Sequence, residues 1–172
     1  MSQAWYYEDF NVGDEFVTVR RTITESDVMT FAGLSGDFNP LHTDQVHAET
    51  TLYGERIAHG LLGLAITTGL KQRLGIFEGT VIGFLAAEWN FRKPLLIGDT
   101  VRCRITIADM RVTSNPQRGI LRQRVELVNQ DDSVIQEGFH TIMIETRLAD
   151  DPDPGAPAAA LSHPSEAATP PA

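Results

Sequence analysis

The later part of the chain alternates between apolar and polar residues. Apolar residues occupy the odd positions from Val101 to Ile107, and polar or small residues occupy the even positions from Arg102 to Ala108. Successive side chains of a strand point to opposite faces of a sheet, so this period predicts a strand with one buried face. Turn-forming residues at 114–119 and 129–133 separate it from similar segments. The further predicted strands are Thr80–Phe91, Ile120–Val128, Val134–Thr146 and an early strand at Phe16–Ile23.

Two helical patterns come before most of these strands. Thr24 and Asp27 form a weak capping box, and the apolar residues after them predict a short helix that ends at Gly33 or Gly36. A second helix is predicted over residues 58–74, with apolar residues on most of its circumference, which is typical of a helix buried on all sides. Its three glycines lower its intrinsic stability, so tertiary contacts must hold it. Periodicity alone predicts an α+β protein.

The composition changes after residue 148. Residues 149–172 are rich in Pro, Ala and acidic residues and contain one Leu as their only large core-forming residue, so we expect a disordered tail. The predicted organisation is one domain over residues 1–148 followed by this tail at 149–172. The net charge of the chain is −9, and most of its 23 acidic residues precede the tail. An acidic surface does not attract a polyanion, so we expect no nucleic-acid partner.

The sequence also bears on the compartment. Cys103 is the only cysteine, which excludes an intrachain disulfide and fits a reducing environment. The first ten residues lack the pattern of a secretory signal. The longest apolar stretch, Ile57–Leu70, includes His59 and two threonines and is shorter than the roughly 20 residues that a membrane helix needs. We therefore expect a cytoplasmic protein without a membrane segment.

Candidate chemistry lies in the segment GDFNPLH, residues 36–42. Pro40 disfavours helical geometry at Asn39, so Asp37 and His42 should follow the first helix on an irregular segment. Five residues of bent chain can place a carboxylate and an imidazole around one water molecule, as an acid–base pair requires. Asn39 can fix the turn by bonding its own backbone. The alternative interpretation is a turn-forming aspartate and a surface histidine.

Metal binding is another option for this region, because His47 and His59 are near in sequence. Neither histidine falls at a recognised ligand spacing. We therefore expect no metal and no cofactor. His59 is interpreted as a residue of the helix start.

The string GDFNPLH, with Phe31 and Ala32 before it and Ala48 after it, closely resembles the signature of MaoC-like, (R)-specific enoyl-CoA hydratases. The segments AHGLL at 58–62 and FRKPLLIGD at 91–99 are similar to further elements of that family, and the likeness extends over roughly residues 8–147. It implies a hot-dog fold, in which a curved antiparallel sheet wraps a central helix, and a homodimer or higher homo-oligomer. It also implies hydration of a trans-2-enoyl-CoA to an (R)-3-hydroxyacyl-CoA.

The resemblance assigns roles to several residues. Asp37 and His42 stand at the catalytic positions, and the backbone N–H of Gly60 at the helix start suits a developing enolate oxygen. Thr68 can bond to Asp37 or, alternatively, to its own helix. Asn39 and Thr68 are expected to contact the substrate. Arg92 and Lys93 are expected to bind the phosphates of CoA, with Arg111 and Arg118 as further candidates. The alternative for each of these cations is a solvated surface charge.

Three classes of function remain open at this point. The first is the enoyl-CoA hydratase. The second is another hot-dog thioester enzyme, an acyl-carrier-protein dehydratase or a thioesterase, and a thioesterase would not need this spacing of Asp37 and His42. The third is a non-catalytic acyl-CoA-binding module, which would have no use for the pair. Fold alone does not separate them.

Overall fold

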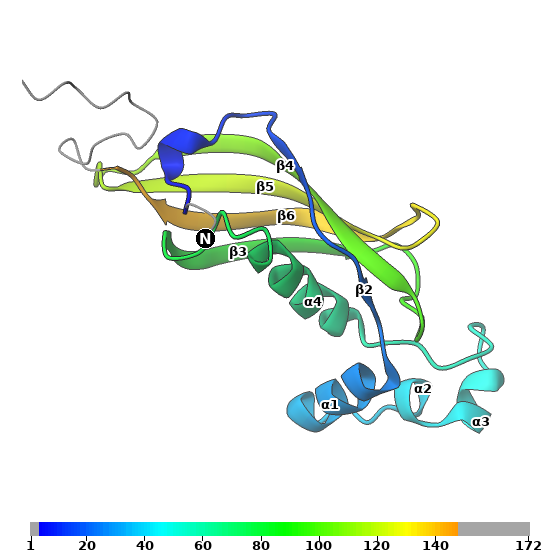
Figure 1. Cartoon of the computed structure of the whole chain (residues 1–172). Helices are drawn as coiled ribbons and strands as arrows, with labels where there is room; N and C mark the ends of the chain where they lie inside the picture. The colour runs from blue at the N-terminus through cyan, green and yellow to red at the C-terminus, as the bar shows by residue number, and fades with distance from the viewer. Residues whose placement is uncertain (1–3, 148–172) are drawn as a thin grey trace, which may run out of the picture.

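The computed structural model describes residues 4–147, and the predicted tail at 149–172 lies outside these residues. A six-stranded antiparallel sheet curls around one long helix, and three shorter helices lie together below the sheet (Figure 1). The predicted α+β architecture is confirmed. The helices are η1 (Tyr7–Asp9), α1 (Glu25–Ser35), α2 (Pro40–Thr43), α3 (Gln45–Glu49) and α4 (Gly60–Gln72). The strands are β1 (Glu15–Val17), β2 (Arg21–Thr22), β3 (Val81–Phe91), β4 (Thr100–Val112), β5 (Arg118–Val128) and β6 (Val134–Glu145).

The sheet has the order β1-β4-β5-β6-β3, with β2 paired to the beginning of β4. All its pairings are antiparallel, and β3 forms one edge. The strand predicted from alternation at 101–108 is confirmed as part of β4. Its odd-numbered side chains, Val101, Cys103, Ile105 and Ile107, are at most 1% exposed. The first three form one core cluster with α4, and Ile107 belongs to a second cluster with residues of β5 and β6.

The early strand is shorter than predicted. Instead of one strand over Phe16–Ile23, the chain forms β1 and β2, and both pair with β4. At Thr18 the backbone N–H donates to the carbonyl of Cys103 at 3.0 Å, and the hydroxyl oxygen accepts from the Cys103 N–H at 2.9 Å. Because a side-chain oxygen takes the place of a backbone carbonyl there, the regular ladder is interrupted after β1.

Helix α1 begins and ends as its sequence predicts. Both bonds of the capping box between Thr24 and Asp27 are present, and Gly36 ends the helix with a φ of 76°, which favours glycine. The next segment is more regular than predicted. His42 lies in the short helix α2, which Pro40 starts at its first position, where a missing N–H is harmless.

The central helix α4 is buried on one face only, which corrects the prediction of burial on all sides. Its buried face packs against the sheet, whereas Leu61 is 60% exposed and Thr68 is exposed as well. A sheet that curls under one side of a helix cannot cover the other side. No helix within residues 4–147 is long and apolar enough to cross a membrane.

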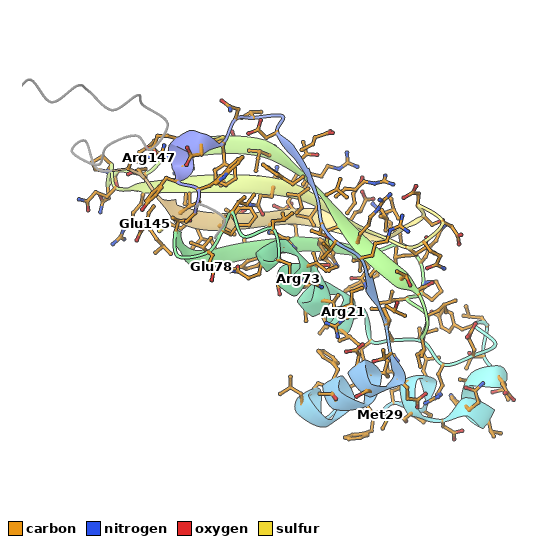
Figure 2. The ribbon with its side chains drawn as sticks, in the orientation of Figure 1. Arg21, Met29, Arg73, Glu78, Glu145 and Arg147 are labelled. Atoms are coloured by element: carbon orange, nitrogen blue, oxygen red, sulfur yellow. The ribbon has the colours of Figure 1, made fainter. Side chains whose placement is uncertain are left out.

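Strands β3 and β6 approach closely at one glycine, and an ion pair follows the end of β6. At Gly138 in β6, a Cβ atom would lie 1.9 Å from the backbone oxygen of Glu88 in β3, so only glycine fits there. After β6, the guanidinium of Arg147 pairs with the carboxylate of Asp9 in η1 at 2.7 Å, near the amino-terminal segment (Figure 2). The chain ends of the described region therefore meet beside the sheet.

Candidate active site

The turn between α1 and α2 positions Asp37. Its backbone N–H donates to the Ser35 hydroxyl, and its carboxylate accepts from the N–H of Asn39, both at 3.2 Å. The side chain of Asn39 accepts from the N–H of Leu41 at 2.9 Å and caps α2. Asn39 therefore fixes the turn through its own backbone, as the sequence predicts, and presents Asp37 as an exposed carboxylate.

The second member, His42, is held by the chain that leads into α4. Its Nδ1 lies 2.7 Å from the carbonyl oxygen of Ile57. Since a carbonyl oxygen only accepts, Nδ1 carries the proton, and in the neutral ring Nε2 carries the free lone pair. The half-buried His42 is thus oriented with a proton acceptor at Nε2.

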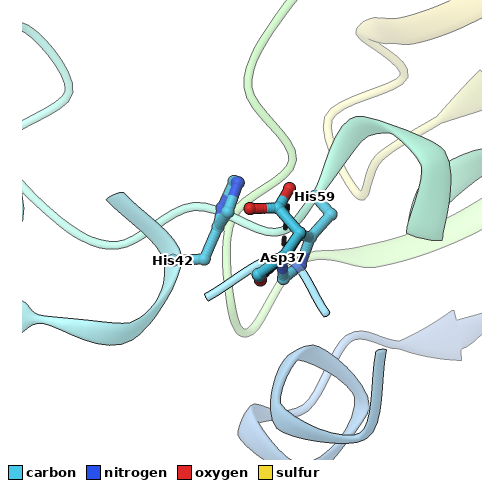
Figure 3. Close-up of side chains that lie close together, drawn as sticks. All are labelled: Asp37, His42 and His59. Atoms are coloured by element: carbon cyan, nitrogen blue, oxygen red, sulfur yellow. Dashed lines mark hydrogen bonds and ion pairs between the residues drawn. The ribbon is translucent and has the colours of Figure 1, made fainter. Parts of the chain in front are cut away.

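A third side chain, His59, completes the cluster (Figure 3). It is 3% exposed, and its ring lies against that of His42 with the centroids 3.8 Å apart. Its Nε2 donates to the carbonyl oxygen of Asp37 at 2.9 Å, which ties the turn after α1 to the start of α4. Sequence reasoning assigned His59 only to the helix start, and the AHG string before a buried helix is the signal that points to it.

The cluster brings three ionisable groups together. One atom from each of Asp37, His42 and His59 lies within 4.8 Å of the others. One nitrogen of each ring already donates to a backbone carbonyl, so only His42 Nε2 and His59 Nδ1 remain as lone pairs. His59 Nδ1 is buried without a partner among residues 4–147. The accessible acceptors are therefore the Asp37 carboxylate and His42 Nε2, which together can polarise one water molecule.

Gly60 begins α4 immediately after His59. Its N–H has no acceptor in the described part of the chain, as is usual at a helix start. A Cβ atom at this position would lie 2.8 Å from Cε1 of Phe91, so the glycine lets the ring approach. On β6, Gln136 donates to the Gly60 carbonyl at 3.1 Å and accepts from the indole N–H of Trp89 at 2.9 Å. The position of the Gly60 amide is therefore fixed from the sheet.

Two of the predicted cations lie beside Gly60. Arg92 and Lys93 line the same pocket of about 310 Å³ as Gly60, Phe91 and Ile57. Arg92 pairs with Glu137 at 2.8 Å, and the Lys93 ammonium donates to the Ser133 hydroxyl at 3.1 Å. One pocket is therefore lined both by Gly60 at the start of α4 and by two cationic side chains.

Three other candidates are not part of this cluster. The Thr68 hydroxyl donates to the carbonyl of Ala65 at 2.7 Å and does not bond to Asp37 within this chain. Arg118 lines a separate pocket with Glu145. Arg111 pairs with Ile120 near the turn between β4 and β5. These positions do not support a phosphate contact from Arg111 or Arg118 at this pocket.

Comparison with known proteins identifies the family of the chain. The MaoC like domain family matches residues 9–129. The (R)-specific enoyl-CoA hydratase of Rhodospirillum rubrum is 34% identical over 143 residues, which are 83% of this chain and 93% of that protein. Protein MaoC of Klebsiella aerogenes is 35% identical over 101 residues, which are 59% of this chain but only 30% of that longer protein.

Similar solved structures include a MaoC-like dehydratase and a protein with a double hot-dog fold. The MaoC-like dehydratase from Rhodospirillum rubrum has a TM-score of 0.74 at 26% identity, and the match covers 84% of this chain and 99% of that one. A Mycobacterium tuberculosis protein described as having a double hot-dog fold has a TM-score of 0.73 at 18% identity, covering 91% of this chain and 52% of that one. The chain has a hot-dog fold and belongs to the MaoC-like dehydratase family.

Proposed function

We propose that this protein adds water to a trans-2-enoyl-CoA and forms an (R)-3-hydroxyacyl-CoA. The observation that carries the proposal is the meeting of Asp37 and His42 with His59, the residue directly before Gly60, whose N–H has no acceptor in the described part of the chain. The hydratase and dehydratase names of the relatives support it at the level of a hydro-lyase. A thioesterase would not need this spacing of Asp37 and His42, and a non-catalytic binder would have no use for the pair.

The reaction requires a nucleophilic water and a proton at the neighbouring carbon. The Asp37 carboxylate and His42 Nε2 can both accept a hydrogen bond, so one water can donate to both. As the water oxygen bonds to C3 of the substrate, one of the two groups takes a proton from the water. The pair then delivers a proton to C2, so that the site returns to its starting protonation state.

The thioester oxygen gains negative charge while C3 is attacked. The N–H of Gly60 points from the start of α4, where unpaired amides and the helix dipole favour an anion. One such donor is worth about 3 kcal/mol of activation free energy. Arg92 and Lys93 flank the same pocket and suit the diphosphate of CoA.

The direct test is incubation of the purified protein with crotonyl-CoA. We expect loss of the enoyl absorbance and formation of 3-hydroxybutyryl-CoA of the (R) configuration. A thiol reagent in parallel measures free CoA, which a thioesterase would release and a hydratase would not. The same acyl group on an acyl-carrier protein compares the two carriers. Release of free CoA without hydration would contradict the proposal.

We expect His59 to act through the position of Asp37. His59→Phe keeps an aromatic ring against His42 but loses the N–H that Asp37 accepts. We expect kcat to fall about 10-fold, because small displacements of a catalytic group have large effects on rate. His59→Gln keeps an N–H donor and should retain more activity than His59→Phe. Equal kcat values for the parent and His59→Phe would show that this bond does not position the site.

We also expect a homodimer that forms through β3. This edge strand is exposed along most of its length, and so is the outer face of α4. An unpaired edge that carries apolar side chains favours pairing with another strand. Its exposed large apolar side chains are Val81, Ile82, Phe84, Leu85 and Phe91, each at least 38% exposed.

The mass in solution tests this expectation. Light scattering should give about twice the chain mass of 19.0 kDa at micromolar concentration. Leu85→Lys places a charge on β3 and should shift the equilibrium toward monomer. Val12→Lys, at a 63% exposed position in the loop before β1, is the matched control and should remain dimeric. A monomeric parent protein would contradict the expectation.

A further inference from the structure

A buried ammonium group lies near the opposite end of α4 from the candidate active site. Lys71 is only 6% exposed. Its ammonium donates to the side-chain oxygen of Gln123 in β5 and to Nδ1 of His140 in β6, the latter at 3.2 Å. Burial, together with the charge of Lys71, lowers the pKa of the His140 imidazole to about 3, so His140 is neutral at pH 7. Both hydrogen-bond partners of the ammonium are therefore uncharged.

No carboxylate within residues 4–147 pairs with Lys71. The nearby Cys103 thiol is no counter-ion, since burial raises its pKa to about 12. The ring of Phe77, 5.8 Å from the ammonium, gives only a weak attraction. Burial lowers the pKa of the Lys71 ammonium to about 8, which leaves most of it protonated at neutral pH. A buried cation without an anion is unfavourable, so this site is suited to an anionic ligand.

The neighbouring side chains add hydrogen-bond donors. Nδ1 of His140 accepts from Lys71, so the proton of the neutral ring is on Nε2. His140 Nε2 and the amide nitrogen of Gln123 are both buried without a partner in the described structure. The cluster thus has three donor groups, on Lys71, Gln123 and His140, and a deficit of acceptors. A carboxylate, which only accepts, would complete it.

Lys71 lines a pocket of about 130 Å³ between α4 and the strands β3 and β6. Lys71 carries the charge among the residues that line this pocket, and most of the others are apolar. At the other end of β3, Phe91 lies against Gly60 at the start of α4, so α4 and β3 come together both at the candidate active site and at this pocket. The other lining residues are Thr68, Gln72, Phe77, Val81, Phe84 and Ile142.

We propose that this pocket receives the far end of the acyl chain and that Lys71 selects chains that end in a carboxylate. The substrate class would then be thioesters of dicarboxylic enoyl acids. This inference rests on the proposed hydratase function, because the thioester group of the same substrate would lie at Gly60. Lys71 is a specificity-determining residue in this assignment and takes no part in the chemical step.

Matched substrate pairs test the selection. Each trans-2-enoyl-CoA with a terminal methyl group is compared with the chain of equal length that ends in a carboxylate, over a series of lengths. We expect kcat/KM to favour the carboxylate in the best pair by about 10-fold or more, since a site built for a polar group rejects an analogue without it. Lys71→Met, which keeps the volume and removes the charge, should reverse this preference.

The control variant is Arg73→Met. It removes an exposed cation two residues further along, where α4 ends (Figure 2), and should leave the preference between the paired substrates unchanged. A preference for the methyl chain by the parent protein at every length would overturn the inference. So would equal preferences in the parent and a folded Lys71→Met.

Binding separates this inference from the proposed function. Calorimetry with saturated acyl-CoA thioesters, with and without a terminal carboxylate, requires no hydration. Tighter binding of the carboxylate form by the parent protein, and its loss in Lys71→Met, would support the pocket even if no enoyl-CoA were hydrated. Should Lys71→Met not fold, equal binding of both forms by the parent protein would still overturn it.

Discussion

Replacing Asp37 with asparagine should lower kcat for enoyl-CoA hydration at least about 100-fold, the lower end for a general acid–base group. Asparagine keeps the shape of the side chain, and its oxygen can still accept from the N–H of Asn39. It cannot take a proton from water. His42→Ala removes the other acceptor and should have an effect of similar size. The double variant should be little worse than the worse single variant, because the two residues act as a unit.

Steady-state kinetics with crotonyl-CoA measures this effect, and KM should change far less than kcat. Asp44→Asn is the matched control, since Asp44 is an exposed aspartate in the same segment that caps α3 through the N–H of His47. Asparagine caps a helix about as well as aspartate, so this variant should leave stability and kcat near the parent values. Circular dichroism should confirm that all variants are folded. A folded Asp37→Asn that hydrates crotonyl-CoA at the parent rate would show that the assigned site is wrong.

The largest effect on stability is expected from Gly138→Ala. The new methyl group would meet the backbone oxygen of Glu88 at 1.9 Å, and a backbone atom within a sheet cannot move aside as a side chain can. Strands β3 and β6 would have to separate locally. We expect a loss of about 3 kcal/mol in the free energy of unfolding, at the upper end for overpacking. Thermal unfolding should show a fall in Tm of roughly 10 °C.

The matched control is the same substitution in a helix. At Gly33 in α1, a Cβ atom would meet nothing within 4 Å, and the backbone is helical. Gly33→Ala should therefore stabilise the protein by up to about 1 kcal/mol, because alanine has the higher helix propensity. If Gly138→Ala unfolds at the parent temperature, the close approach of β3 and β6 is not as described.

Sequence reasoning succeeded where a local pattern determines a local structure. The capping box at Thr24 and the alternation in β4 depend on neighbouring residues, so they can be read along the chain. It was less successful where distant segments decide. The hydroxyl of Thr18 interrupts the early strand only because Cys103 lies opposite, and the exposed face of α4 depends on how far the sheet curls.

At the candidate site too, the sequence predicted local features and missed those that depend on distant segments. The GDFNPLH string predicted that Asp37 and His42 lie close together and that Asn39 fixes the turn, because these residues belong to one short segment. The prediction that His59 stands at the helix start is confirmed, but its bond to the carbonyl of Asp37 could not be predicted, because Asp37 is 22 residues away in sequence. The buried state of Lys71 could not be predicted either, because Gln123 and His140 reach it from two later strands.

The contact that orients His42 leaves one neighbouring side chain open to redesign. The acceptor at Ile57 is its backbone carbonyl, whereas its side chain lines the pocket beside Gly60. Every amino acid supplies the same carbonyl, so the hydrogen bond that orients the His42 ring does not depend on which side chain occupies position 57. Substitutions there should change the shape of this pocket while the imidazole of His42 keeps its orientation.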